Sequence, residues 1–240
     1  MSSNTERLDE ATAAEIVASH PWWYHRFEIF PGIVTPGVYD PSGTLSRLHL
    51  PHDLTGARIL EIGAADGYFT KTLSARGADV TAVDYAAKDF HGFAIMERLS
   101  GRKFEFINAN VYWLDELGLK PFDIVLCLGV LYHLPDMLRA LFTIRSFVKD
   151  LFILETLVAR EHEEEPFARY LPAASVNGDD TNFWAPNVLC CQKILADCNF
   201  VVRDTWVNEN RAMFHCGVAT GALATRKMGM AYDRRIKPGT

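Results

Sequence analysis

Sequence features typical of secreted proteins, membrane proteins or proteins with a structural metal site are scarce in this sequence. Its five cysteines include no Cys-x-x-Cys pair, which argues against a structural zinc site and against a disulfide framework. The longest apolar run, residues 124–132, is about half the length of a membrane span. The first ten residues lack the basic start and apolar core of a signal peptide. We therefore expect a reduced, soluble, cytoplasmic protein with no metal centre and no membrane partner.

Positive charge is scarce as well. The chain has 24 Lys and Arg against 30 Asp and Glu, a formal net charge of −6, so it has no general attraction to phosphate backbones. A local basic patch could still bind RNA, but a nucleic-acid partner is less expected. The length of 240 residues and the 49% hydrophobic content fit one α/β domain with additions, or one domain and a small lobe.

Strand and helix patterns alternate from residue 58 onward. This order implies a mostly parallel, doubly wound sheet. The last two strands need little crossover, so they are expected to form an antiparallel pair at the sheet edge. We predict an α/β fold with a Rossmann-like sheet of seven strands. The expected strands span residues 58–62, 79–84, 104–108, 122–128, 150–156, 200–206 and 212–219, and the expected helices span residues 66–76, 90–99, 136–147 and 186 or 187 to 198.

The segment before this alternation has a different composition. Residues 9–19 favour a helix that Asp9 can cap. Residues 20–53 are rich in Pro, Gly and aromatic side chains, which leaves no room for long regular structure. This segment is expected to be a strap packed over the sheet, an active-site lid that contributes Tyr24 or His25, or both.

A second irregular segment, residues 160–187, interrupts the alternation after the fifth strand. We expect it to be an insertion over the carboxyl edge of the sheet, on the side where a substrate would bind. The expected organisation is therefore a helix and strap at 1–57, the main domain at 58–220 and a loosely held tail at 221–240.

The most informative motif lies in residues 58–70, RILEIGAADGYFT. A buried strand here runs into a turn of small residues and a helix start, with Glu61 at the carboxyl end, where open α/β sheets bind ligands. The turn lacks the second glycine of the dinucleotide fingerprint. It keeps Gly63 and Gly67, and Asp84 ends the next strand, where an acid can bind both ribose hydroxyls. A cofactor-free or nucleotide-binding domain of the same fold remains the alternative.

The spacing from Glu61 to Gly67 resembles motif I of class I S-adenosylmethionine (SAM) methyltransferases. The segments LGVLYHLPD (128–136), LETLV (154–158), WYHRFEIFPGIVTPGVYD, ARYLP and NFWAP resemble one branch of that class. It contains the tRNA wobble-uridine (methoxyuridine) methyltransferases and the uridine 5-oxyacetic acid carboxymethyltransferases, and the resemblance covers about residues 20–219. The cofactor residues that it implies are Glu61, Gly63, Ala65, Gly67, Asp84, Tyr85, Asn110, Val111, Leu128 and Tyr132.

The carboxymethyl branch holds a carboxylated cofactor through a lysine, a tyrosine and an arginine. By resemblance Tyr132 and Arg211 match the tyrosine and the arginine. The lysine is expected near residues 23–25, where this chain has aromatic residues and histidine. Without that ammonium the carboxylate would lose its main point charge, so we favour plain SAM.

Methyl transfer from a sulfonium needs positioning, and an O or N acceptor gains from a base. His133 is the first candidate base, followed by Glu155 and His25. The alternatives are a structural histidine bonded to nearby backbone, and a Glu155 paired with Arg169 or Arg211. Candidate acceptor contacts are Tyr24, Arg169, Tyr170, Trp184 and Arg211.

The leading functional prediction is SAM-dependent methylation of O or N on a small polar or aromatic metabolite. The first alternative is methylation of a wobble 5-hydroxyuridine in tRNA. A second is a non-catalytic SAM-binding partner subunit, against which the intact motif I argues. The sequence leaves open the acceptor and the choice between a monomer and a homodimer.

Overall fold

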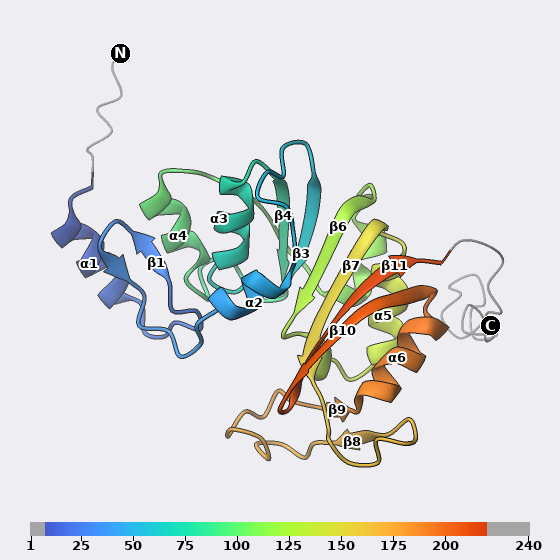
Figure 1. Ribbon diagram of the computed structural model, residues 1–240. Helices are drawn as coiled ribbons and strands as arrows, with labels where there is room; N and C mark the ends of the chain where they lie inside the picture. The colour runs from blue at the N-terminus through green and yellow to red at the C-terminus, as the bar shows by residue number, and fades with distance from the viewer. Residues whose placement is uncertain (1–7, 220–240) are drawn as a thin grey trace, which may run out of the picture. The chain divides into compact units, whose positions relative to one another are not determined.

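The computed structural model describes residues 8–219 (Figure 1). The chain divides into two compact units, Met1–Ala109 and Asn110–Thr240, called the first and second unit below. The predicted tail at 221–240 lies outside the described residues. The predicted domain boundary after residue 57 rests on the motifs and stays a prediction.

The predicted fold class is confirmed by a seven-stranded sheet. In the first unit β3, β4 and β5 pair in parallel, and in the second unit β6 and β7 do so. Strand β11 runs antiparallel to both β7 and β10, and β10 lies at the edge. The strands are β3 (Arg58–Ile62), β4 (Asp79–Asp84), β5 (Glu105–Asn108), β6 (Phe122–Leu128), β7 (Val148–Leu157), β10 (Phe200–Asn208) and β11 (Arg211–Val218).

Helices follow the strands close to the predicted positions. Helix α3 begins two residues later than expected, because Gly67 has a left-handed φ of 79° and ends the glycine turn. Asp136 and Asn187 cap α5 and α6 by accepting from the backbone N–H three residues on. These helices are α3 (Tyr68–Ala75), α4 (Phe93–Ser100), α5 (Met137–Arg145) and α6 (Val188–Asp197).

The aromatic strap is packed into the core of the first unit. Helix α1 (Glu10–Ser19) starts at its predicted cap Asp9, and short elements follow it. Trp23 is 2% exposed and belongs to one apolar cluster with α1, α4 and Ala82 of β4. The burial of this large ring stabilises the strap by about 2–3 kcal/mol. The short elements are β1 (Glu28–Phe30), β2 (Ile33–Val34) and α2 (Ser42–Arg47).

The predicted insertion forms a small antiparallel sheet of its own in the second unit. Strands β8 (Ala168–Tyr170) and β9 (Trp184–Pro186) pair with each other. Two 3-10 helices, η1 (Val111–Glu116) and η2 (Leu131–His133), follow β5 and β6. Within residues 8–219 no helix is long and apolar enough to cross a membrane.

Candidate active site

The glycine turn after β3 has the backbone that its sequence predicts. Gly63 and Gly67 have φ of 81° and 79°, in the region that side chains avoid. A Cβ on Gly67 would lie 2.4 Å from Met96 Cε and 2.9 Å from Phe93, so glycine is required there. Ala65, at the position of the absent glycine, has a φ of 45°. The turn therefore keeps a glycine-like shape through Ala65.

Asp84, at the end of β4, is hydrogen-bonded to this turn. Its Oδ2 accepts from Ala65 N at 2.9 Å and its Oδ1 from Ala86 N at 2.9 Å. Asn108, which the sequence prediction missed, donates from Nδ2 to the carbonyl oxygens of residues 84–86 at 2.8–3.0 Å. Tyr85 is held between these anchors with 74% of its surface exposed. Each carboxylate oxygen of Asp84 keeps lone-pair capacity for a further donor.

Glu61 faces the protein interior. It is 2% exposed, and its Oε2 accepts a hydrogen bond from the Thr70 hydroxyl in α3. Its Oε1 has no hydrogen-bond partner among the described residues. Burial raises the pKa of Glu61 to about 8, although the Thr70 hydrogen bond opposes this. Glu61 thus joins strand and helix beneath the turn in its protonated form at neutral pH.

Asp66 is the main residue of the first unit that sequence reasoning missed. This fully buried carboxylate accepts from Tyr24 N at 2.8 Å and His25 N at 2.7 Å, and from Gly92 N at 2.9 Å. It therefore ties the strap and the loop before α4 to the glycine turn. The only sequence signal is an acid inside a glycine turn, and its partners lie 26 to 42 residues away.

His25, the third candidate base, is buried among aromatic side chains. It is 4% exposed and lies within 6.0 Å, ring centre to ring centre, of Tyr24, Tyr39, Tyr68 and Phe69. Burial lowers the pKa of His25 to about 4, against the attraction of Asp66. The enclosing rings pack against His25, and its place as the third candidate base stays a prediction.

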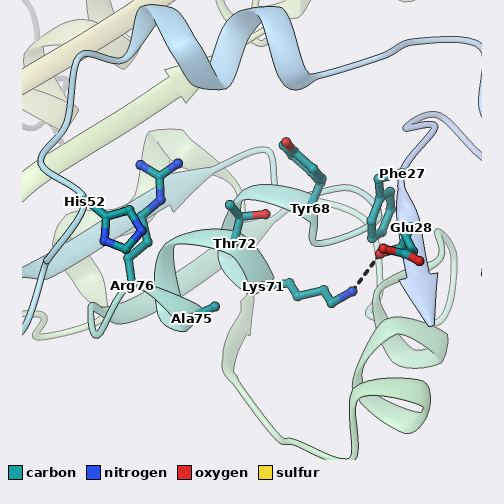
Figure 2. A pocket seen from close by; sticks show the side chains of 8 residues that line it. All are labelled: Phe27, Glu28, His52, Tyr68, Lys71, Thr72, Ala75 and Arg76. Carbon is teal, nitrogen blue, oxygen red and sulfur yellow. Dashed lines mark hydrogen bonds between the residues drawn. The ribbon is translucent and has the colours of Figure 1, made fainter. Parts of the chain in front are cut away.

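A pocket of about 450 Å³ opens on the outer side of α3 in the first unit (Figure 2). Lys71 donates to the carbonyl oxygens of Glu28 and Ile29 at 2.8 and 3.0 Å, and His52 and Arg76 lie at the other end of the pocket. None of residues 63–67 lines it. This pocket is therefore distinct from the glycine turn.

In the second unit, Glu155 and Arg211 form the paired arrangement that the sequence left open. Arg211 donates from Nε and Nη2 to the two Glu155 oxygens, both at 2.6 Å. Burial opposes the charge, but Glu155 raises the pKa of Arg211 above its ordinary value. The guanidinium also lies 4.9 Å from the Tyr132 ring centre. Both Glu155 oxygens are engaged by the guanidinium, which is the paired alternative with Arg211, and a catalytic role for Glu155 stays a prediction.

His133, at the end of η2, lies beside the insertion. Its Nδ1 is 2.9 Å from Thr181 Oγ1 and 3.2 Å from Thr181 O. Burial lowers the pKa of His133, although the bond to the Thr181 backbone and Asp179 oppose this. A half-buried, neutral imidazole at the carboxyl end of β6 has the properties of a general base. Asp179 and Thr181 were not foreseen, because nothing in the local sequence connects them to His133.

The other residues predicted to bind the acceptor or the cofactor in the second unit differ in exposure and in their hydrogen-bond partners. Arg169 pairs with Glu161 at 2.5 Å on the surface. Tyr170 is 57% exposed and lies edge-on to Trp184, whose Nε1 donates to Pro135 O at 3.0 Å. Tyr170 is thus the more accessible ring. The predicted cofactor residues of this unit are Asn110, which caps η1, the buried Val111, the half-buried Leu128 and the buried Tyr132.

Comparison with known proteins identifies the family. The model of the methyltransferase domain family matches residues 39–202. A tRNA U34 carboxymethyltransferase of Dichelobacter nodosus is 30% identical over 171 residues, 66% of this chain and 52% of the relative. A ubiquinone biosynthesis O-methyltransferase of Aromatoleum aromaticum is 32% identical over 123 residues, 49% of this chain and 48% of the relative. The solved N-terminal domain of EvdMO1 with S-adenosylhomocysteine bound superimposes with a TM-score of 0.67 at 19% identity, over 90% of this chain and 99% of that one.

The chain therefore belongs to the methyltransferase domain family, and its fold is that of the class I SAM-dependent methyltransferases. SAM is the methyl donor in this class. The chain spans about half the length of the curated relatives that it matches.

Proposed function

We propose that the protein transfers a methyl group from SAM to an oxygen or nitrogen of a small polar or aromatic metabolite. The observation that carries the cofactor assignment is the glycine turn bonded to Asp84, with Ala65 N and Ala86 N on its two oxygens. The donor's ribose would take the remaining lone pairs of Asp84. Gly63 and Gly67 give the turn its left-handed backbone, against which the donor would lie, and the exposed Tyr85 offers an aromatic surface to its adenine.

Calorimetric titration with SAM tests this assignment. We expect Asp84→Ala to weaken binding by roughly 1–3 kcal/mol, through loss of two hydrogen bonds to the ribose. Asp79→Ala is the matched control, because Asp79 is an exposed acid at the other end of the same strand. Asp84→Asn, which keeps one oxygen acceptor, should lie between. Absence of SAM binding to the unmodified protein would reject the function, and unchanged affinity in Asp84→Ala would reject this role.

The acceptor assignment rests on the polar groups of the second unit. His133 would take the proton that a hydroxyl or amine loses on methylation. Tyr170 and Trp184 offer rings to a planar acceptor. The Arg211 guanidinium, whose Nε and Nη2 are bound to Glu155, offers positive charge to an acceptor oxygen. The likeness to a ubiquinone biosynthesis O-methyltransferase supports a small acceptor.

A panel of catechols, phenols and heteroaromatic amines, with radiolabelled SAM, tests the acceptor class. We expect turnover of at least one member of the panel. His133→Gln should lower that turnover about a hundredfold. His162→Gln is the control, because His162 is an exposed histidine of the insertion. Turnover that is equal in the two variants would exclude His133 as the base.

A second candidate, methylation of a wobble uridine in tRNA, is favoured by one observation, the 30% identity to a tRNA U34 carboxymethyltransferase. For either acceptor we propose plain SAM, because residues 23–25 are Trp, Tyr and His with no lysine. Competition between SAM and its carboxylated form in the same titration tests that preference. Tighter binding of the carboxylated form would overturn it.

We also propose a cytoplasmic location. In support, the five cysteines are free, and Cys127, Cys191, Cys198 and Cys216 are buried thiols, as is usual in a reducing compartment. Cell fractionation followed by immunodetection checks the location.

A further inference from the structure

The imidazole of His133 is in contact with a loop that follows β8. Thr181 N and Thr181 Oγ1 both donate to Asp179 Oδ1, at 2.8 and 2.6 Å. The loop is attached to the His133 turn on each side of that residue, since Phe183 N donates to Tyr132 O at 2.8 Å and Trp184 Nε1 to Pro135 O at 3.0 Å. These bonds hold Thr181 beside the imidazole.

The hydrogen positions in the Asp179–Thr181–His133 series of hydrogen bonds follow from the number of hydrogens that each group carries. The Thr181 hydroxyl has one hydrogen, and Asp179 Oδ1 receives it. Its oxygen can then only accept from His133 Nδ1, 2.9 Å away, and the Thr181 carbonyl, at 3.2 Å from the same nitrogen, can only accept. Both contacts therefore require a hydrogen on Nδ1 of His133. A neutral imidazole with Nδ1–H has its lone pair on Nε2.

We propose that Thr181 and Asp179 are positioning residues, which hold His133 in the Nδ1–H tautomer and direct the basic Nε2 to the methyl acceptor. The inference rests on the proposed function for the role of Nε2. The tautomer itself does not depend on it.

In the reaction, the acceptor oxygen or nitrogen forms a bond to the methyl carbon while the sulfonium–carbon bond breaks. The sulfur keeps that electron pair and leaves as neutral S-adenosylhomocysteine. The acceptor proton passes to His133 Nε2, which gives an imidazolium. Asp179 stabilises this cation through the Thr181 hydroxyl, as a carboxylate behind a histidine does in other catalytic sites.

Other groups that face His133 favour or oppose the protonation of its imidazole. Asp179 favours the imidazolium, whereas burial and Arg211 oppose it. The Tyr132 ring lies 4.1 Å from the imidazole, centre to centre, and adds no charge while its pKa stays raised by burial. Asp179 is kept ionised, because hydrogen bonds from Thr181 lower its pKa in spite of burial. Among residues 8–219, Asp179 is the one carboxylate that raises the pKa of His133 in this way.

The direct test is long-range ¹H–¹⁵N correlation NMR of protein with ¹⁵N-labelled histidine, at a pH where His133 is neutral. The His133 signal is identified by its loss in His133→Gln. We expect a protonated Nδ1 and an unprotonated Nε2. Thr181→Val should shift His133 toward a mixture of tautomers and lower its pKa, because the hydroxyl acceptor is lost. Thr181→Ser should restore the wild-type signal.

Turnover gives a second readout. In Thr181→Val and Asp179→Asn we expect kcat/KM to fall about tenfold and the acid limb of its pH profile to move to lower pH. Ser175→Ala, in the same loop, is the control that should leave both unchanged. An Nε2–H tautomer in the unmodified protein, or an unchanged tautomer and pH profile in folded Thr181→Val, would overturn the inference. If the tautomer behaves as expected but no acceptor is methylated, the inference stands and the proposed function fails.

Discussion

At the scale of single residues, Glu61 has the least usual environment in the first unit. Its side chain is buried, with one oxygen bound to Thr70 and the other without a partner among the described residues. The folded state therefore retains a proton on Glu61 up to a pKa of about 8, whereas the unfolded chain releases it near 4.5. Between these values the folded state binds more protons, so the contribution of Glu61 to stability falls as the pH rises.

Glu61→Gln is expected to remove this pH dependence. A glutamine keeps an oxygen acceptor for Thr70 and carries no charge. The free energy of unfolding of the variant, relative to wild type, should therefore increase between pH 5 and pH 8, by roughly 2–5 kcal/mol. Urea denaturation at the two pH values measures it, with Glu15→Gln on the exposed face of α1 as control. Parallel curves for wild type and Glu61→Gln would mean that Glu61 is ionised in the fold.

At the scale of elements, the sequence predicted what depends on local pattern. Strands β4 and β6 begin and end where predicted, because a buried parallel strand is a largely apolar run of residues. The glycine turn was also predictable from local sequence, because glycine adopts the left-handed conformation that Gly63 and Gly67 have. Long-range partners were not predictable in this way. Neither the Asp66 contacts to the strap nor the Thr181 contact to His133 leaves a periodic signal.

The strap provides a prediction at this scale. Asp66→Asn keeps one oxygen acceptor and loses the other, so at least one buried N–H among Tyr24, His25 and Gly92 loses its partner. Each unsatisfied N–H costs about 1–3 kcal/mol, and the strap should open locally before the sheet unfolds. Hydrogen exchange of those three amides is expected to accelerate at least tenfold, while β4 amides keep their protection.

Asp53→Asn is the matched control for the strap. Asp53 also accepts from a backbone N–H, that of Thr55 at 2.9 Å, but in an exposed turn. It should leave the exchange of the strap unchanged. Equal exchange in Asp66→Asn and wild type would show that packing around Trp23, rather than Asp66, holds the strap.

At the scale of the whole molecule, charge distinguishes the two acceptor classes. The net charge of −6 opposes binding to RNA. In the second unit, three arginines already face carboxylates. The pairs are Arg160 with Glu163, Arg169 with Glu161 and Arg211 with Glu155. A phosphate backbone would have to compete with these carboxylates for the guanidinium groups.

The salt dependence of binding and turnover follows from this distribution. For a small acceptor we expect kcat/KM to change less than about threefold between roughly 50 and 200 mM salt, because few counterions are released. Unmodified tRNA transcript should bind weakly in fluorescence anisotropy and should accept no methyl group from radiolabelled SAM. Arg169→Gln should not alter this, since Glu161 already occupies that guanidinium. Binding of the transcript that weakens about a thousandfold over the same salt range, together with methylation of its wobble uridine, would establish tRNA as the acceptor despite the acidic surface.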